Sequence, residues 1–337
     1  MAPADIPEIK RAGLPVDLNR LTADGDDWLS AGERYALKTH GVCAQAQPHV
    51  FMIRCRTGGS LTSRTARQLA AVADRCGSSW LHLTTRQQIE LHHVDAREVT
   101  TVLEEVRRTG LTTNSACGHT MRGVMSCPDA GVGLEEPFDC RPDARAIADS
   151  ILELCPALNA KMPQRLNISF GGCAECRNHA KLNDAGFVSV ITDDGELGYE
   201  LWVGGSLGKS APTLATKALD FVPRADVLPA VHALFDVFVT HGNLDQPNKA
   251  RMKFLVRRLG VEPFLELFRD AYAQAPTRTW PPPAPVSTPL TSSITEILAH
   301  VPEGGWGSGV RPQRIPGRAM VTVNVPLVSC AGDPLKI

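Results

Sequence analysis

The chain has 337 residues, of which 43% are hydrophobic and 21% charged, enough for two or three packed domains. Its 35 basic and 36 acidic residues leave a net charge of −1, and only 5% of residues are aromatic, which argues against a nucleic-acid-binding or membrane-surface protein. The sequence holds no apolar run of about 18 residues and begins with the polar stretch MAPADIPEIKRAG, so we expect a cytoplasmic protein without a membrane span or secretory signal.

The first part of the chain predicts a small α+β unit. Residues 1–30 are polar and form an N-terminal arm, and the unit itself occupies 31–112. Within it, strand patterns at 49–56 and 80–94 are each followed by a helical pattern. Gly77 ends the first helix, and Asp95 and Gly110 begin and end the second. Strand and helix alternate, as in a small α+β sandwich.

A second unit is predicted over residues 113–275. It contains a strand at 165–170, a hairpin at 187–205 with the turn dipeptide Asp194-Gly195, and helical stretches at 227–242 and 248–273. Residues 276–300 form a proline-rich linker, and a short segment, 301–337, follows.

One pattern occurs twice. Gly41-Val42-x-x-Gln45-x-x-Pro48 precedes the strand FMIRCR, and the same frame from Gly309 to Pro316 precedes AMVTVNV, 268 residues later. We interpret this as an internal duplication in which the second copy ends after one strand.

Five arginines lie in short strand-like motifs. Alternation along the strand at 51–56 places Arg54 and Arg56 on the face opposite Ile53 and Cys55. A buried guanidinium needs an anionic partner, which is either an internal carboxylate or a ligand. Five such residues favour a polyanionic ligand, because guanidinium groups bind carboxylates and oxyanions through paired hydrogen bonds. The five are Arg54, Arg56, Arg86, Arg122 and Arg165.

Four of the ten cysteines are candidate metal ligands. Cys117 and Cys127 are separated by nine residues, and Cys173 and Cys176 form a C-x2-C motif. Four thiolates can hold zinc or an iron–sulfur cluster, although unligated cysteines are an equal alternative. HExxH, GxSxG, P-loop and GxGxxG motifs do not occur, which argues against the corresponding hydrolases and nucleotide-binding enzymes.

Seven ordered motifs together resemble the siroheme-containing nitrite and sulfite reductase family. They are GVCAQAQPHVFMIRCRTGGSLT, LHLTTRQQIELHHV, CGHTMRGVMSCPDAG, MPQRLNISFGGC, NDAGFVSV, GYELWVGGSLG and KARMKFLVRRLGVEPF. The resemblance covers about residues 30–275 and resumes after residue 300. It implies an α+β fold: a ferredoxin-like half-domain, an α/β domain that binds siroheme and a [4Fe–4S] cluster, and the start of a second ferredoxin-like half.

The resemblance also implies an activity, the six-electron reduction of nitrite to ammonia or of sulfite to sulfide. Its cofactors are siroheme and a [4Fe–4S] cluster, and its partners are a small oxyanion and an electron donor such as ferredoxin or a reductase subunit. A precorrin-3B synthase-like tetrapyrrole enzyme and a non-catalytic half that needs a separate partner chain are the alternatives.

Residue roles follow from the matched motifs. Arg54 and Arg122 correspond to arginines that bind the substrate, Arg165 stands where relatives have a lysine, and Asn167 stands where nitrite reducers have asparagine. Expected siroheme contacts are Arg56, His82, Thr84, Arg86 and Glu90.

The sequence departs from the family at several places. His82 replaces a common arginine and Glu90 a common glutamine. The usual cluster cysteines belong to the second half of the family fold, so Cys117, Cys127, Cys173 and Cys176 are either relics or ligands of a separate cluster.

Overall fold

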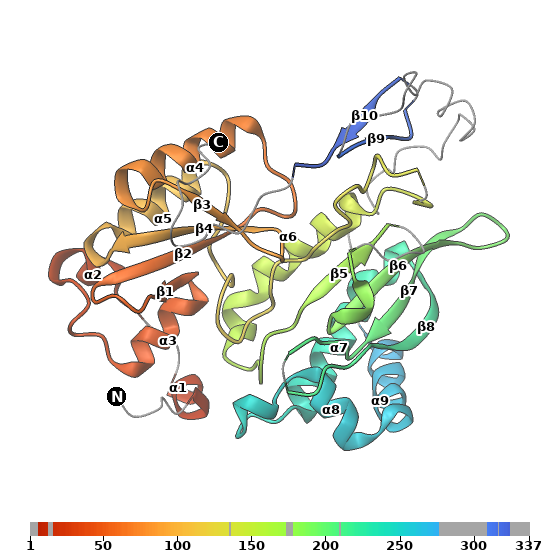
Figure 1. The fold of residues 1–337 in the computed structure, drawn as a ribbon. Coiled ribbons are helices and arrows are strands. Elements are labelled where there is room, and N and C mark those ends of the chain that lie inside the picture. The colour runs from red at the N-terminus through yellow and green to blue at the C-terminus, as the bar shows by residue number, and fades with distance from the viewer. Residues whose placement is uncertain are drawn as a thin grey trace.

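The computed structural model describes residues 6–12, 16–134, 136–172, 178–208, 210–275, 309–315 and 317–323. Within these ranges, two four-stranded sheets with their own helices lie side by side (Figure 1). A long loop after the first unit leads into the second. No helix in the described part of the chain is long and apolar enough to cross a membrane.

The first sheet is antiparallel, in the order β1-β2-β4-β3. Helices α4 and α5 share its apolar core, in which Ile53 and Cys55 are fully buried with Leu69 and Val102. Gly77 follows the last residue of α4, as the sequence predicts, and the side chain of Thr62 caps its first turn. The elements are β1 (Val42–Ala44), β2 (Val50–Arg56), α4 (Ser63–Cys76), β3 (Leu81–Leu83), β4 (Gln88–Asp95), η1 (Ala96–Glu98) and α5 (Val99–Arg108).

In the described residues before this sheet there are three helices: α1 (Ile6–Ala12), α2 (Leu18–Asp24) and α3 (Ala31–Thr39). Helix α2 packs on α5, where the hydroxyl of Thr22 donates to that of Thr100 over 2.7 Å. Helix α1 reaches the second unit, because the buried ammonium of Lys10 donates to the carbonyl of Met162. Burial lowers the pKa of Lys10 to about 8.

The second sheet has the order β5-β6-β7-β8, with β5 parallel to β6 and the other pairs antiparallel. Its core is aromatic: the rings of Phe170 and Phe187 stack at 4.9 Å, and Tyr199 meets both edge-on. The elements are α6 (Arg141–Asn159), β5 (Ile168–Gly171), η2 (Ala180–Leu182), β6 (Ala185–Ile191), β7 (Leu197–Val203), β8 (Thr216–Pro223), η3 (Arg224–Asp226), α7 (Val227–His241), η4 (Pro247–Lys249), α8 (Met252–Leu259) and α9 (Val261–Ala273).

The structure differs from the sequence prediction in this unit at three places. The helical stretch at 248–273 is two helices, α8 and α9, which separate at Gly260 with φ of 91°. Helix α6 and strand β8 were not predicted. The hairpin predicted at 187–205 is confirmed as β6 and β7.

A third, two-stranded sheet begins in the second copy of the repeated sequence pattern. Strands β9 (Val310–Pro312) and β10 (Ala319–Val321) are antiparallel, and Val310 pairs with Val321. In the first copy, Val42 pairs with Ile53, so both partners shift by the same 268 residues. The two hairpins therefore share their register and not only a sequence pattern.

The glycine before each hairpin has the same role. Gly41 and Gly309 have φ of 78° and 81°, where a side chain would strain the backbone. Gly41 accepts a hydrogen bond from the amide of Arg54 at 2.9 Å, and Gly309 accepts one from Thr322 at 2.7 Å.

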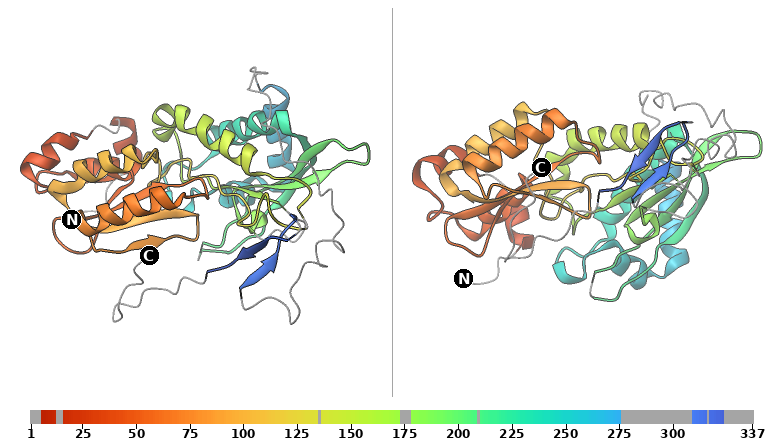
Figure 2. Two further views of the ribbon diagram at one scale, coloured as in Figure 1. Left: turned by 90° about the horizontal axis from the view of Figure 1, so that it is seen from above. Right: turned by 45° about the horizontal axis from the view of Figure 1, so that its top comes forward.

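The second hairpin is held against the loop before α6 (Figure 2). The amide of Arg314 donates to the carbonyl of Val132 over 3.0 Å, and its guanidinium forms a buried ion pair with Glu136 at 3.3 Å. The proline-rich linker predicted at 276–300 and the segments 301–308 and 324–337 lie outside the described residues.

Candidate anion-binding site

One face of the first sheet carries polar side chains in register. Glu90 of β4 lies between Arg54 of β2 and His82 of β3. Two residues further along β2 on the same face, Arg56 pairs with Gln88 of β4. The neighbours Ile53 and Cys55 point into the core on the other face. The predicted division of this strand into an arginine face and an apolar face is thus confirmed.

Arg54 is not a free cation. Its Nε donates to Oε1 of Glu90 over 2.7 Å, and its Nη2 donates to the same oxygen. His92 holds the other carboxylate oxygen, with Nε2 2.9 Å from Oε2. Burial alone would raise the pKa of Glu90, but the hydrogen bond from His92 and the charge of Arg54 hold it below its ordinary value.

The loop from 112 to 127 lies between the two sheets. On one side Arg56 donates to the carbonyls of Met121, at 3.3 Å, and Asn114. On the other side, Met121 forms a parallel bridge with Leu166 and Met125 one with Ser169. The loop therefore joins the polar face of the first sheet to the start of β5.

Arg122 of this loop is half-buried and bound to backbone carbonyls. Its Nη1 donates to Ala116 and its Nη2 to Gly118, the latter over 2.9 Å. Its Nε is buried and has no hydrogen-bond partner among the described residues. Burial, with the neighbouring arginines, lowers its pKa to about 10, partly offset by the Cys117 thiol.

Arg86 sits at the β3–β4 turn and reaches the second unit. Its Nη1 donates to Oδ1 of Asn183 over 2.8 Å, and its Nη2 to the carbonyl of Gly123 over 3.0 Å. Its buried Nε also has no partner within the described ranges, and burial lowers its pKa to about 10. The hydroxyl of Thr84 accepts the amides of Arg86 and Gln88, at 3.3 and 3.1 Å, and so fixes the turn.

Arg165 and Asn167 come just before β5. The pKa of Arg165 is lowered, mainly by burial and in addition by the positive charge of Arg251. The amide of Asn167 donates to Oδ2 of Asp184 over 2.9 Å, and that fully buried carboxylate also binds Arg251 at 2.8 Å. The side-chain oxygen of Asn167 is buried and unpartnered among the described residues.

These arginines form one electropositive cluster. Arg54 and Arg165 each lower the pKa of Arg122, and Arg122 and Arg165 lower that of Arg86. Within the described residues, only Arg54 of these four has a carboxylate in ion-pair contact; Arg86, Arg122 and Arg165 have none.

The structure describes two of the four predicted metal-binding cysteines. Cys117 neighbours Cys43, and that thiol, with the charges of Arg54 and Arg122, lowers the pKa of Cys117 to about 7 against the opposing effect of burial. The thiol of Cys127 donates to Asp129 over 2.8 Å, and Cys127 also neighbours Cys140. Cys173 and Cys176 lie outside the described residues, so the four-cysteine site stays a prediction.

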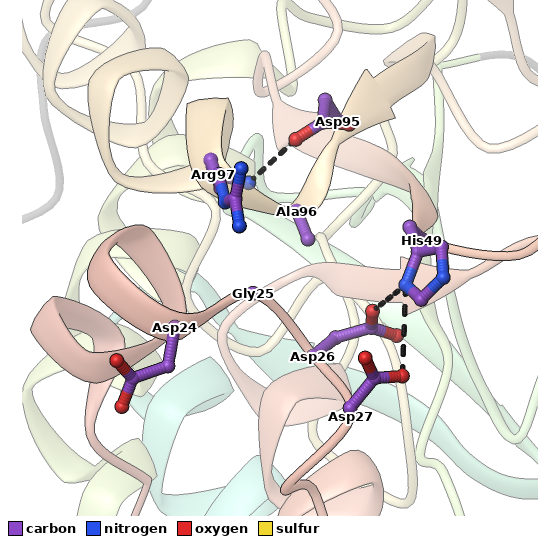
Figure 3. A pocket seen from close by; sticks show the side chains of 8 residues that line it. All are labelled: Asp24, Gly25, Asp26, Asp27, His49, Asp95, Ala96 and Arg97. Carbon is purple, nitrogen blue, oxygen red and sulfur yellow. Dashed lines mark hydrogen bonds and ion pairs between the residues drawn. The ribbon is translucent and has the colours of Figure 1, made fainter.

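Among the described residues, the one set of three or more metal-type ligands that could share an ion is Asp26, Asp27 and His49. It borders a cavity of about 270 Å³ on the first unit (Figure 3). Asp26 is already bound by His49 Nδ1 at 2.6 Å and by Arg34 Nη1 at 3.1 Å. These contacts join Asp26, which follows α2, to His49, which precedes β2. The cluster therefore has a structural role.

Sequence reasoning missed the residues that hold the arginines in place. Asn183 and Asp184, which bind Arg86 and Arg251, belong to the motif NDAGFVSV, whose polar start was a usable signal. Gln88 is also buried at the site with an unpartnered Nε2 among the described residues, and a side chain on Gly123 would collide with that nitrogen.

Two family profiles match the chain. Residues 44–108 match the "Nitrite/Sulfite reductase ferredoxin-like half domain", and residues 117–276 match the "Nitrite and sulphite reductase 4Fe-4S domain". The chain belongs to the nitrite and sulfite reductase family. Siroheme and a [4Fe–4S] cluster are the cofactors that membership of this family implies.

Similar proteins include reductases of both anions. "Sulfite reductase [ferredoxin] 2" of Mycolicibacterium paratuberculosis is 30% identical over 81% of this chain and 48% of its own. "Ferredoxin--nitrite reductase" of Synechococcus elongatus is 27% identical over 95% of this chain and 61% of its own. The solved structure of Mycobacterium tuberculosis NirA protein superposes with a TM-score of 0.71 and 25% identity over 85% of this chain and 56% of that one. The chain thus spans about half the length of the curated relatives it matches.

The described residues fit siroheme better than they fit an iron–sulfur cluster. The buried, unpartnered Nε atoms of Arg86 and Arg122 can each donate to a carboxylate, and siroheme is a polycarboxylate. By contrast, Cys117 and Cys127 do not share a group of three ligands within the described part of the chain. A conventional all-cysteine cluster needs four thiolates.

Proposed function

We propose that this chain supplies the half of a siroheme-dependent nitrite or sulfite reductase that binds the siroheme carboxylates and the substrate oxyanion. The reaction is the six-electron reduction of nitrite to ammonia or of sulfite to sulfide. Ferredoxin is the proposed donor, since relatives of both kinds are named as ferredoxin enzymes. The second half of the family fold, which the relatives' greater length includes, completes the enzyme.

One observation carries this proposal: three clustered arginines have no carboxylate in ion-pair contact among the described residues, and two of them keep a buried, unpartnered N–H group. Leaving a buried donor unsatisfied costs about 1–3 kcal/mol, and more for a charged group. A bound anion removes this cost, so the cluster favours a polyanionic ligand over a purely structural role.

We assign the roles by position. Arg86 and Arg56, with the turn that Thr84 fixes, face the siroheme carboxylates, and Arg54, Arg122 and Arg165 bind the oxyanion. Siroheme, when bound, supplies the iron at which the anion is reduced. The residues of this chain bind and orient that anion through charged hydrogen bonds.

Glu90 sets this chain's site apart. It and His92 share a hydrogen bond that can hold a proton between Oε2 and Nε2 beside Arg54. His82 of β3 pairs with Glu90 and stands where the family commonly has an arginine. Glu90, His92 and His82 thus place titratable groups where a fixed positive charge is common. We propose that they deliver protons toward the bound anion.

The cytoplasm is the proposed location. Six cysteines in the described part of the chain are free thiols, which fits a reducing compartment: Cys43, Cys55, Cys76, Cys117, Cys127 and Cys140.

The test is the colour and cofactor content of the purified chain. Expressed in a host that makes siroheme, the chain should show siroheme absorption bands, and Arg86→Ala should lower its siroheme content at least several-fold. Arg64→Ala, on the exposed side of α4, is the matched control and should keep the bands. A correctly folded chain that remains colourless and binds neither nitrite nor sulfite contradicts the proposal.

A further inference from the structure

A β-bulge interrupts the pairing of β2 with β4 between Phe51 and Ile53. Two residues of β4, His92 and His93, stand there opposite one residue of β2. His93 has a φ of 58°, a left-handed conformation that residues other than glycine rarely adopt. A bulge leaves one residue outside the hydrogen-bond ladder, so the amide of His93 is available to a partner from elsewhere.

The side chain of Gln45 is this partner. Gln45 directly follows β1, and its own amide donates to the carbonyl of Val50 over 2.9 Å, which continues the hairpin. Its Oε1 accepts the amide of His93 over 2.7 Å. A backbone amide only donates, so the side-chain atom that it meets is the carbonyl oxygen and not the amide nitrogen. The bulge therefore fixes which way round the amide group of Gln45 lies.

The other end of this amide group meets His92. Nε2 of Gln45 lies 3.4 Å from Nδ1 of His92. Because an amide nitrogen only donates hydrogen bonds, Nδ1 accepts and carries no proton. The one proton of a neutral imidazole ring then lies on Nε2, 2.9 Å from Oε2 of Glu90, where a carboxylate accepts it. Each donor in this row thus meets an acceptor.

Aromatic contacts hold the ring of His92 in place. Trp80 lies against it with the ring centroids 4.8 Å apart and the planes inclined by 30°, and the ring of His82 is 5.7 Å away. A ring turned over about its Cβ–Cγ bond would present carbon atoms to Gln45 and Glu90 and lose both hydrogen bonds. The position of the ring and the two polar contacts therefore support the same proton position.

We propose that Gln45 is a positioning residue, which holds the neutral ring of His92 in the tautomer protonated at Nε2. It closes Nδ1 to protons, because a proton there would face the Nε2 donor of Gln45. A proton that the His92–Glu90 pair takes up from water therefore goes to the carboxylate of Glu90, on the side of Arg54, where a bound anion can receive it. The use of that proton in anion reduction rests on the proposed function, whereas the tautomer does not.

The second hairpin offers a matched control. Gln313 is the counterpart of Gln45 in the repeated sequence frame, 268 residues later. Its Nε2 donates to the carbonyl of Ala319 over 3.3 Å, so this amide group binds backbone where that of Gln45 meets an imidazole ring. The same substitution at Gln313 therefore changes an equivalent hairpin without touching His92.

The experiment records long-range proton–nitrogen NMR spectra of the histidine rings in the nitrogen-15-labelled full-length chain. Spectra are taken at about pH 8, above the ordinary histidine pKa of about 6.5. They distinguish a protonated from an unprotonated ring nitrogen, and the signals missing in His92→Gln assign His92. We expect the proton on Nε2 and none on Nδ1. A ring protonated at Nδ1 alone, or at both nitrogens, overturns the proposal, and this result depends on no other variant's folding.

Gln45→Glu tests whether Gln45 is the cause. A carboxylate still accepts the amide of His93, so the bulge keeps its partner, but it offers Nδ1 of His92 an acceptor in place of a donor. We expect Nδ1 to be protonated in most molecules of this variant, whereas Gln313→Glu should leave the His92 signals unchanged. The wild-type tautomer in Gln45→Glu would show that Gln45 only supports the bulge.

This readout is separate from the test of the proposed function, because it needs neither siroheme nor nitrite. A chain that binds no siroheme but shows His92 protonated at Nε2 contradicts only the proposed function. A chain that binds siroheme but shows His92 protonated at Nδ1 contradicts only the role of Gln45.

Discussion

Arg54 and Glu90 face each other across β2 and β4, and the Nε of Arg54 donates to Oε1 of Glu90 over 2.7 Å. Glu90 is in turn held by His92. One of the two arginines expected to bind the substrate is therefore largely neutralised by a carboxylate of its own sheet. Glu90 sets how much of that charge an anion experiences.

Replacing Glu90 by glutamine should release Arg54. We expect Glu90→Gln to tighten binding of nitrite or sulfite by about tenfold, equivalent to about 1.4 kcal/mol, because one opposing charge is removed. Titration calorimetry of the purified chain measures this effect. Glu104→Gln, on the exposed surface of α5, is the control and should bind as the wild type. Unchanged affinity in Glu90→Gln would show that Arg54 does not face the anion.

Arg122 should matter for both binding and stability. Arg122→Ala removes a charged anion contact worth about 1.5–3 kcal/mol, so the anion affinity should fall by one to two orders of magnitude. It also frees the carbonyls of Ala116 and Gly118, so thermal unfolding should begin at a lower temperature. Arg122→Lys keeps the charge without the fork and should give an intermediate affinity. A folded Arg122→Ala protein with wild-type affinity contradicts the assignment.

Asn167 should influence which anion is preferred. With Arg165 as the one cation of this pair, the site favours the monoanion nitrite over sulfite, which can carry two charges. Asn167→Lys should therefore raise the affinity for sulfite relative to nitrite, by a few-fold or more. The ratio of the two dissociation constants is the measurement. A wild-type chain that already binds sulfite much more tightly than nitrite reverses the expected preference.

Asp184 should be a strong determinant of stability. Its fully buried carboxylate binds Arg251 and the amide of Asn167, so Asp184→Ala leaves an uncompensated buried cation. Such losses cost about 3–5 kcal/mol. Urea denaturation measures the difference, and Asp220→Ala, at an exposed position of β8, should change it little. Equal midpoints for Asp184→Ala and the wild type would contradict the prediction.

The His49–Asp26 contact should make stability depend on pH. The hydrogen bond to Asp26 raises the pKa of His49, so this contribution is complete below the ordinary histidine pKa of 6.5 and is lost as pH rises through the higher folded value. Burial alone would raise the pKa of Asp26, but hydrogen bonds from His49 and Arg34 lower it, so its contribution is lost as pH falls below its ordinary value of 3.8.

Unfolding curves at several pH values test this dependence. His49→Gln should abolish the loss on the alkaline side and leave on the acid side only the part that Arg34 supplies. An identical pH profile for His49→Gln and the wild type would show that the contact does not contribute.

Local signals predicted most of the first unit. In β2 the half-buried Arg54 stands between the buried Ile53 and Cys55, and the glycine after α4 marks the end of that helix in the sequence. Helix α6 gave no such signal: Cys140 before it makes no side-chain cap, and a proline within its sequence indicates a stop. Gly260 divided a continuous apolar pattern into α8 and α9, because its positive φ ends one helix before the next begins.

The site was predictable as a list of arginines but not as an arrangement. The pairing of Arg54 with Glu90 depends on the β2–β4 register, which no local pattern fixes. The contact between Arg86 and Asn183 joins the two units across 97 positions of sequence. Which arginines are neutralised and which remain available is therefore a property of the tertiary structure.

The equal register of the β1–β2 and β9–β10 hairpins allows the two copies to be compared position by position. Valines 42 and 310 and methionines 52 and 320 are the same residue in both, whereas Arg54 corresponds to Thr322 and Cys43 to Arg311. The inward-facing pair stays apolar in both copies, Val42 with Ile53 and Val310 with Val321, whereas Arg54 has no arginine counterpart in the second copy. The second hairpin therefore presents a hydroxyl where the first presents the guanidinium of Arg54, so two hairpins of equal register offer different chemistry.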